Sequence, residues 1–396
     1  MKSIAKRIAA VALAGIMGGS LLTGCGSKSN AIDGSKTVVT VNKEEVPLGV
    51  LSFYAKFEQA QIYTYYGSML GTTGMFDQTM EASSADSGEE AKTYGQSLRD
   101  TCLTDIEKMV VMRQKADDYD ITLTDDEKDE IDKAAQAYID NNSEEDRKKI
   151  GARKEDVVEL MTLETYQSKM LDPIAKDVDT NVTDEEAQQT SVTYVSISTE
   201  DTSSSSEATS EATESTSGED FKLQAEANAQ SILTAVQNAS DPATADMDAL
   251  AKAVDSSYSA TTGHYTTSDT TDGTVDSKVV EAVKDLKDGQ VADQVITGSD
   301  GKTLYVARLD KVNDEDETET KKASIVRQRK QDEYDKVTDE WVKAATIDVD
   351  NDVLNTLTIT DADPVSLKMP ASSDTTSTTE ATSDVTSTAE AASTAS

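Results

Sequence analysis

The chain has 396 residues, long enough for two or three domains, and it carries 37 lysines and arginines against 75 aspartates and glutamates, for a net charge of −38. That charge excludes a nucleic-acid partner, because phosphate contacts need a surface rich in lysine and arginine. One histidine and two cysteines exclude a zinc site of histidine and cysteine ligands, and no cofactor-binding fingerprint occurs. We therefore expect neither a metal nor a cofactor.

The first 24 residues have the pattern of a lipoprotein signal peptide. Lys2, Lys6 and Arg7 precede an uncharged stretch of apolar and small residues, 8–22, that is too short to span a bilayer. The stretch ends in Leu-Thr-Gly-Cys, which resembles a bacterial lipobox. The resemblance implies that Cys25 is lipidated and anchors the protein to the extracytoplasmic face of the bacterial cell membrane. The alternative is an ordinary signal peptide followed by a chance cysteine.

Two segments lack the apolar residues that folding requires. Residues 199–220 contain 12 serines and threonines and seven acids, and residues 371–396 form a similar Ser/Thr-rich tail. We expect a disordered insert and a disordered tail. The other expected parts are a tether over 25–36, a helical domain over 37–189, a sheet-containing domain over 190–313, and a C-terminal helical segment over 320–360.

Apolar spacing predicts helices before and after a central region of mixed structure. Helices are predicted over 48–66, 94–119, 124–139, 153–171 and 321–345, where apolar residues recur every three or four positions or a capping box occurs. The intervening region has strand-like alternation in SVTYVSIS. Its expected elements are strands over 37–46, 191–198, 290–297 and 303–312, and helices over 221–237, 247–254 and 278–286. The order indicates an α+β protein.

Several stretches resemble PrsA-like foldase lipoproteins and the broader SurA-type chaperones. These are VTVNKEEV at 39–46, ADDYDITLTDDE at 116–127, VTDEEA at 182–187 and the residues from Leu250 to Val312. The resemblance implies a helical chaperone domain, completed by a C-terminal helix, into which a parvulin-type peptidyl-prolyl isomerase domain is inserted. It also implies that the partners are unfolded or secreted polypeptides.

The same resemblance assigns the candidate site residues, and the match departs from the family there. Tyr194 and Thr303 stand where parvulin-type sites have histidines, and Asp255 stands at the acid or cysteine position. Val275 and Val279 replace the methionine and phenylalanine of the proline pocket. A smaller pocket without histidines excludes water less well. We therefore expect weak or absent isomerase activity.

Two further residues, His264 and Cys102, carry side chains that can be reactive in other proteins. His264, the single histidine, follows a glycine and is expected in an exposed loop rather than in an acid–base role. Cys102 lies in a helical pattern and is expected to be a buried small hydrophobe rather than a nucleophile.

The favoured function is a membrane-tethered chaperone and foldase for secreted proteins, whose helical domain offers apolar contacts to clients. The alternatives are an active isomerase with an altered site, a solute-binding lipoprotein and a surface adhesion or spacer protein. The aromatic residues of the first helix are the candidates for client contact, although the first three are equally compatible with a core. They are Phe53, Tyr54, Phe57, Tyr63, Tyr65 and Tyr66.

Overall fold

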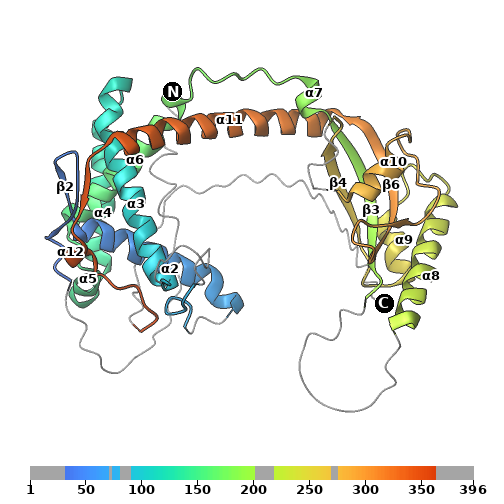
Figure 1. Ribbon diagram of the computed structural model, residues 1–396, viewed down its shortest axis with the longest axis horizontal. Coiled ribbons are helices and arrows are strands. Elements are labelled where there is room, and N and C mark those ends of the chain that lie inside the picture. Colours follow the sequence, from blue (N-terminus) through green and yellow to red (C-terminus); the bar gives the residue numbers. More distant parts are fainter. Residues whose placement is uncertain (1–31, 71–73, 81–90, 201–217, 269–274, 363–396) are drawn as a thin grey trace, which may run out of the picture. The chain divides into compact units, whose positions relative to one another are not determined.

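The protein consists of two compact units in a computed structural model that describes residues 32–70, 74–80, 91–200, 218–268 and 275–362. The first unit ends at Lys176 and resumes at Glu333; the second spans residues 177–332. We call them the helical unit and the sheet unit (Figure 1). The predicted signal peptide with Cys25, nearly all of the insert and the whole tail lie outside the described residues. Among those residues, we find no helix whose length and apolarity suit a membrane span.

The helical unit contains most of the helices and a small antiparallel sheet of order β2-β1-β7. Its elements are β1 (Thr37–Val41), β2 (Glu44–Pro47), α2 (Leu48–Leu70), α3 (Tyr94–Lys115), the 3-10 helix η1 (Ala116–Tyr119), α4 (Asp125–Asn141), α5 (Glu144–Ile150), α6 (Lys154–Ile174), β7 (Ile347–Val349) and α12 (Asn351–Leu354).

Capping residues define where the main helices of this unit begin. The side chain of Thr124 accepts a hydrogen bond from the Glu127 N–H, and the Glu127 carboxylate accepts one from the Thr124 N–H, as the sequence predicted. Thr93 and Gln96 form the same arrangement before α3. The helices bury a common core, in which the rings of Phe53 and Tyr138 meet edge to face with centroids 5.1 Å apart.

The sheet unit is built on an antiparallel sheet of order β4-β3-β6-β5. Its elements are α7 (Asp184–Ala187), β3 (Gln189–Ser198), α8 (Gly218–Gln237), α9 (Met247–Val254), β4 (Ala260–Thr266), α10 (Ser277–Val283), β5 (Ile296–Thr297), β6 (Thr303–Asp314) and the first part of α11 (Glu315–Ala344). From Glu333 onward, α11 belongs to the helical unit.

Helices cover both faces of this sheet, and the alternation along β3 decides which side chains face which helices. Val195 and Ile197 pack with residues of α8 and α9. Val192 and Tyr194 point the other way and pack with residues of α10. The sheet unit therefore has two separate apolar cores, one on each face.

The expected fold class, α+β with a sheet domain inserted into a helical domain, is confirmed. Several element predictions were wrong. His264 lies within β4 rather than in an exposed loop, and the strand expected over 290–297 is reduced to Ile296 and Thr297, with an isolated bridge from Val291 to Arg308. The last long helix begins at Glu315 instead of residue 321.

Candidate functional site

Tyr194, which the sequence placed in the candidate isomerase site, lies in the middle of β3 on the α10 face. Its ring meets the ring of Tyr305 edge to face, with centroids 5.6 Å apart. In β4 it pairs with Thr261, and its ring lies over Gly263, the partner of Val192. A Cβ atom on Gly263 would stand 3.2 Å from the Tyr194 ring and 2.7 Å from Val275 Cγ2. The absence of a side chain at Gly263 therefore lets both Tyr194 and Val275 approach the backbone of β4.

Val275 and Val279 belong to the same apolar cluster as Tyr194, so three of the five candidate residues in this domain lie together. Val279 is 0% exposed and Val275 is 6% exposed. A prolyl ring could contact Val279 only if the surrounding side chains moved. In this structure the position of the expected proline pocket is packed as a core.

Thr303 lies at the beginning of β6, at the edge of this group. It pairs with Ser198, four residues along β3 from Tyr194, which corresponds to roughly 13 Å. Its hydroxyl donates to Asp300 Oδ2 at 2.7 Å, and its N–H donates to Asp300 Oδ1 at 2.9 Å. The structure thus uses Thr303 to hold a turn, while Tyr305, which sequence reasoning did not single out, provides the aromatic partner of Tyr194.

Asp255 follows α9, a helix that packs on the opposite face of the sheet from Tyr194. Its carboxylate accepts hydrogen bonds from the N–H of Ser257 at 2.9 Å and from the Ser257 hydroxyl at 2.7 Å. These bonds lower the pKa of Asp255, with the backbone N–H making the largest contribution. The side chain is exposed and serves a local turn, and the structure does not bring it to Tyr194, Val275 or Val279.

A serine, a histidine and an aspartate do meet in the sheet unit, at one end of β3. Ser191 Oγ lies 2.8 Å from His264 Nδ1 and donates to Asp314 Oδ2 at 2.7 Å. In a hydrolase triad the histidine stands between the other two residues, whereas here the serine does. Ser191 is also only 2% exposed, so its hydroxyl is not available as a nucleophile. The arrangement joins β3, β4 and the end of β6.

Among the described residues, no group of three or more histidine, cysteine, aspartate or glutamate side chains has an arrangement that could hold a metal ion. Cys102 is 2% exposed, and burial raises the pKa of its thiol, so its environment is that of a core residue.

The helical unit presents partly exposed aromatic rings around its core. Phe53 and Phe57 are buried and therefore unavailable to clients, so their alternative assignment to the core holds. Tyr54 and Tyr63 are half-buried, and the side chains of Tyr65 and Tyr66 lie outside the description. The rings that pack on the core and retain exposure are those of Tyr54, Tyr63, Tyr94, Tyr119, Tyr166 and Trp341.

Three partly buried carboxylates from three helices have raised pKa values near Tyr54. Burial raises the pKa of Glu58 on α2 and of Asp105 on α3, and Asp105 raises that of Glu58 further. Burial, with a smaller contribution from Glu58, raises the pKa of Glu164 on α6 to about 7. Asp105 accepts a hydrogen bond from the Tyr54 hydroxyl at 3.4 Å. The folded state therefore disfavours ionisation of all three acids.

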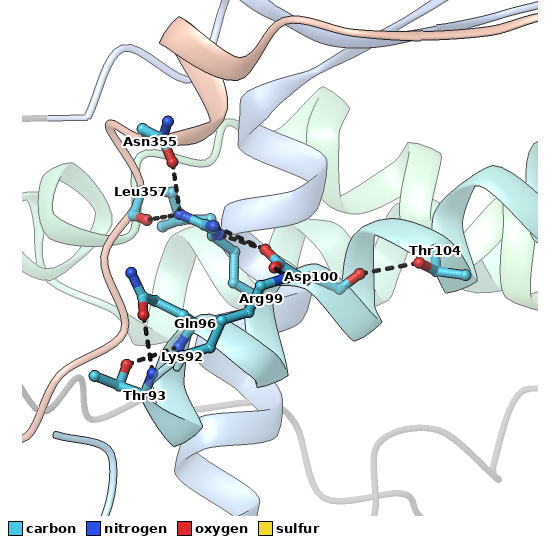
Figure 2. Close-up of polar contacts among 8 residues, drawn as sticks. All are labelled: Lys92, Thr93, Gln96, Arg99, Asp100, Thr104, Asn355 and Leu357. Carbon is cyan, nitrogen blue, oxygen red and sulfur yellow. Dashed lines mark hydrogen bonds and ion pairs between the residues drawn. The ribbon is translucent and has the colours of Figure 1, made fainter. Parts of the chain in front are cut away.

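After α12 the chain runs without regular secondary structure across α2 and α3, and we call residues 355–361 the strap. Arg99 Nη1 donates to Asn355 Oδ1 and to the carbonyl oxygen of Leu357, both at 3.4 Å (Figure 2). Asp100 Oδ1 accepts two hydrogen bonds from the guanidinium, at 3.0 Å from Nε and 2.8 Å from Nη2. Lys92 Nζ approaches the other Asp100 oxygen at 2.7 Å.

Sequence reasoning missed Arg99, although a signal was present. Arg99 stands three and seven residues before Cys102 and Ile106, on the stripe of α3 that was predicted to be buried. The arginine is only 8% exposed, and a charged residue on a buried stripe needs a partner. Asp100 and the strap carbonyl are those partners.

Comparisons with known proteins give fold similarity only. No family model matches the sequence, and no curated protein matches it. The fold is similar to the crystal structure of foldase protein PrsA from Lactococcus lactis, with 12% identity, 80% of this chain and 96% of that chain covered, and a TM-score of 0.32. It is also similar to foldase protein PrsA from Streptococcus pneumoniae, with 15% identity, 70% and 97% coverage, and a TM-score of 0.28. Both structures carry the name of the family that the sequence resembles.

Proposed function

We propose that the protein is a chaperone that holds unfolded segments of secreted polypeptides on its helical unit. The observation that carries this proposal is the set of six aromatic rings that pack on the core of the helical unit yet remain partly exposed. Tyrosine and tryptophan rings at a surface give apolar contacts with a polar tip, which suits partners of varied sequence. One such pair is Tyr119 and Trp341, whose ring centroids lie 5.7 Å apart.

The proposed place of action is the extracytoplasmic side of the membrane, with lipidated Cys25 as the anchor. The support is the charged start, apolar stretch and lipobox-like ending of the first 25 residues. Two or more acyl chains on one cysteine would give stable attachment, where a single chain is marginal.

The sheet unit is proposed to have weak or absent isomerase activity. The support is the packing of Tyr194, Val275 and Val279 into one core cluster, together with the separate positions of Asp255 and Thr303. The unit retains an ordered sheet, so loss of the enzymatic site does not imply loss of the fold.

The proposal is tested with the soluble body of the protein, residues 26–370, which lacks the predicted signal peptide, Cys25 and the Ser/Thr-rich tail. It is titrated into a chemically unfolded client protein, and suppression of client aggregation is measured. Replacing Trp341 and Tyr119 together by alanine should weaken suppression several-fold. The matched control is Tyr265→Phe in the sheet unit, where the ring is buried and no client contact is proposed. If wild type and the double variant are both folded and suppress aggregation equally, Trp341 and Tyr119 do not contact the client. If wild type does not suppress aggregation, the proposed function is wrong.

A further inference from the structure

The strap lies on the helical unit in the manner of a bound extended peptide. Leu357 and Ile359 are 0% and 4% exposed, whereas Thr358 between them is exposed. This alternation is that of a strand with one face buried. Within the described part of the chain, the backbone N–H groups of residues 358–360 donate to no protein acceptor, so the strap belongs to neither sheet.

Beneath the middle of the strap, residues 357–360, the polar contacts are made to the backbone. Gln59 Nε2 donates to the Thr360 carbonyl at 2.9 Å, and Arg99 Nη1 donates to the Leu357 carbonyl at 3.4 Å. Gly95 leaves room for the Ile359 carbonyl oxygen, because a Cβ atom there would stand 1.9 Å from it. Contacts of this kind would be available to any extended segment with apolar residues two positions apart.

The recognition groups are held in place independently of the strap. Arg99 is oriented by Asp100, which Lys92 approaches in turn, and all three residues precede the strap by more than 250 positions (Figure 2). Gln59 projects from α2, and its Oε1 accepts a hydrogen bond from Lys56 Nζ of the same helix at 3.3 Å. Groups that are positioned before binding cost less to engage, which favours a binding surface over a contact that forms only with the strap.

The far end of the strap is fastened by one carboxylate. Asp361 Oδ2 accepts hydrogen bonds from the N–H of Phe76 at 2.7 Å and of Asp77 at 3.0 Å. Asp361 Oδ1 accepts one from the Tyr63 hydroxyl at 2.5 Å. Asp361 itself is only half-buried, so its loss would release the strap end without opening the core.

We propose that this surface of α2 and α3 is a receptor for extended apolar segments of unfolded polypeptides, and that the strap is its resident, exchangeable occupant. The inference rests on the proposed chaperone function and names the place and form in which a client segment binds. A client segment with apolar residues at alternate positions displaces residues 357–361, inserts its own side chains and accepts the hydrogen bonds from Gln59 and Arg99.

The test uses a fluorescent peptide with the sequence of residues 354–362, LNTLTITDA, and the whole soluble body of the protein. The variant Asp361→Ala weakens the occupant, so its affinity for the peptide should rise at least about tenfold over wild type, since charged hydrogen bonds are lost only from the strap. The variant Gly95→Val blocks the surface, and it should release the strap without any gain in peptide affinity. Both variants loosen the strap through different contacts, so an effect of general destabilisation on peptide affinity would appear in both.

Limited proteolysis within residues 357–361 reports strap release in both variants, because a released strap becomes open to cleavage. Circular dichroism reports folding, and Gly95→Ala replaces Gly95→Val if the larger substitution does not fold. A peptide with serine at the positions of Leu357 and Ile359 should not bind. The inference is overturned if the strap of Asp361→Ala stays protected, if its release brings no gain in affinity, or if the serine peptide binds equally well. If wild type suppresses aggregation while one of these results is obtained, the proposed chaperone function is retained. Only the proposal that clients bind in place of the strap is then rejected.

Discussion

Gly95 in α3 lies directly against the backbone of Ile359, so closely that a Cβ atom on the glycine would stand 1.9 Å from the Ile359 carbonyl oxygen. The two residues are separated by most of the chain, and their contact joins the beginning of α3 to the last described segment of the helical unit. Because the neighbouring atom belongs to the backbone, no rotation of a side chain can make room.

The variant Gly95→Ala should therefore destabilise the helical unit. Alanine would gain up to about 1 kcal/mol in helix propensity, but the clash with a buried backbone carbonyl should cost more, about 1–3 kcal/mol net. Urea denaturation followed by circular dichroism measures the change. The control is Thr101→Ala, an exposed position in the same helix. A variant as stable as wild type would show that the strap does not press on α3.

Glu164 should make the protein less stable as the pH rises. Its pKa is raised from the ordinary value of 4.5 to about 7, mainly by burial, so the folded protein retains a proton that the unfolded chain releases. The preference of the folded state for protonated Glu164 stabilises the protein fully below pH 4.5. This stabilisation is lost as the pH rises through about 7, where the carboxyl ionises in the folded state as well. The variant Glu164→Gln should raise the free energy of unfolding by about 1–3 kcal/mol at pH 8 and change little at pH 4.5.

Thermal unfolding at the two pH values measures this difference, with about 2–4 °C expected for each kcal/mol in a chain of this size. The matched control is Glu130→Gln, an exposed carboxylate on α4. A gain that is the same at both pH values would attribute the effect of Glu164→Gln to packing rather than to ionisation.

Lys169 on α6 and Glu127 at the beginning of α4 form a partly buried ion pair, with side chains 16% and 8% exposed. Lys169 Nζ lies 2.9 and 2.7 Å from the two Glu127 oxygens and donates to the Thr122 carbonyl at 2.8 Å. The variant Lys169→Met leaves the Glu127 charge buried without its partner and should cost about 3–5 kcal/mol in denaturant unfolding. Adding Glu127→Gln should recover part of that loss; a double variant no more stable than Lys169→Met would contradict this reading.

The anchor prediction concerns Cys25. Replacing it with alanine removes the thiol that the lipobox-like ending offers for lipidation, so the protein should leave the membrane fraction or accumulate as a longer precursor. Detergent phase partitioning and the mass of the N-terminal peptide distinguish these results. Cys102→Ala is the control, because that thiol is buried in the helical core. Unchanged partitioning of Cys25→Ala would exclude a lipid anchor at this residue.

Local sequence patterns predicted many of the helices and strands. The elements that they did not predict depend on contacts between residues far apart in the sequence. The capping box at Thr124 placed the beginning of α4, and the alternation over 191–198 placed β3. By contrast, β4 has the sequence ATTGHYT, in which no apolar alternation is visible, and it becomes a strand because it pairs along β3. The strap and β7 are short, and their partners lie hundreds of residues earlier in the chain.

In the candidate site, too, the sequence predicted some positions correctly, whereas others were decided by the folded structure. Tyr194, Val275 and Val279 were placed by family spacing, and they meet in one cluster because β3 and α10 pack together. The positions of Asp255 and Thr303 depend on turn geometry: each takes part in a local turn, as an acceptor from Ser257 and as a donor to Asp300. Spacing in a sequence specifies the strand or helix that carries a residue, but not the direction that a turn gives to its side chain.

The last prediction is that the protein does not accelerate prolyl isomerisation appreciably and that Asp255→Ala changes nothing in that assay. Catalysis by a parvulin-type site requires the prolyl ring to enter an apolar pocket away from water. Here Val279 is fully buried, and Tyr194 packs edge to face on Tyr305, so the corresponding space is filled by the protein itself. Asp255 is exposed and engaged by Ser257.

The measurement is cis–trans exchange of an Xaa-Pro peptide at rising concentrations of the soluble body. The rate should stay within error of the uncatalysed rate for wild type and for Asp255→Ala, while aggregation suppression is retained by both. The variant Tyr194→Ala serves as a second probe, because it opens space beside Gly263 without supplying a catalytic group. An enzymatic rate in wild type that disappears in Asp255→Ala would mean that the exposed carboxylate reaches a bound substrate, and the isomerase alternative would replace the degenerate-domain proposal.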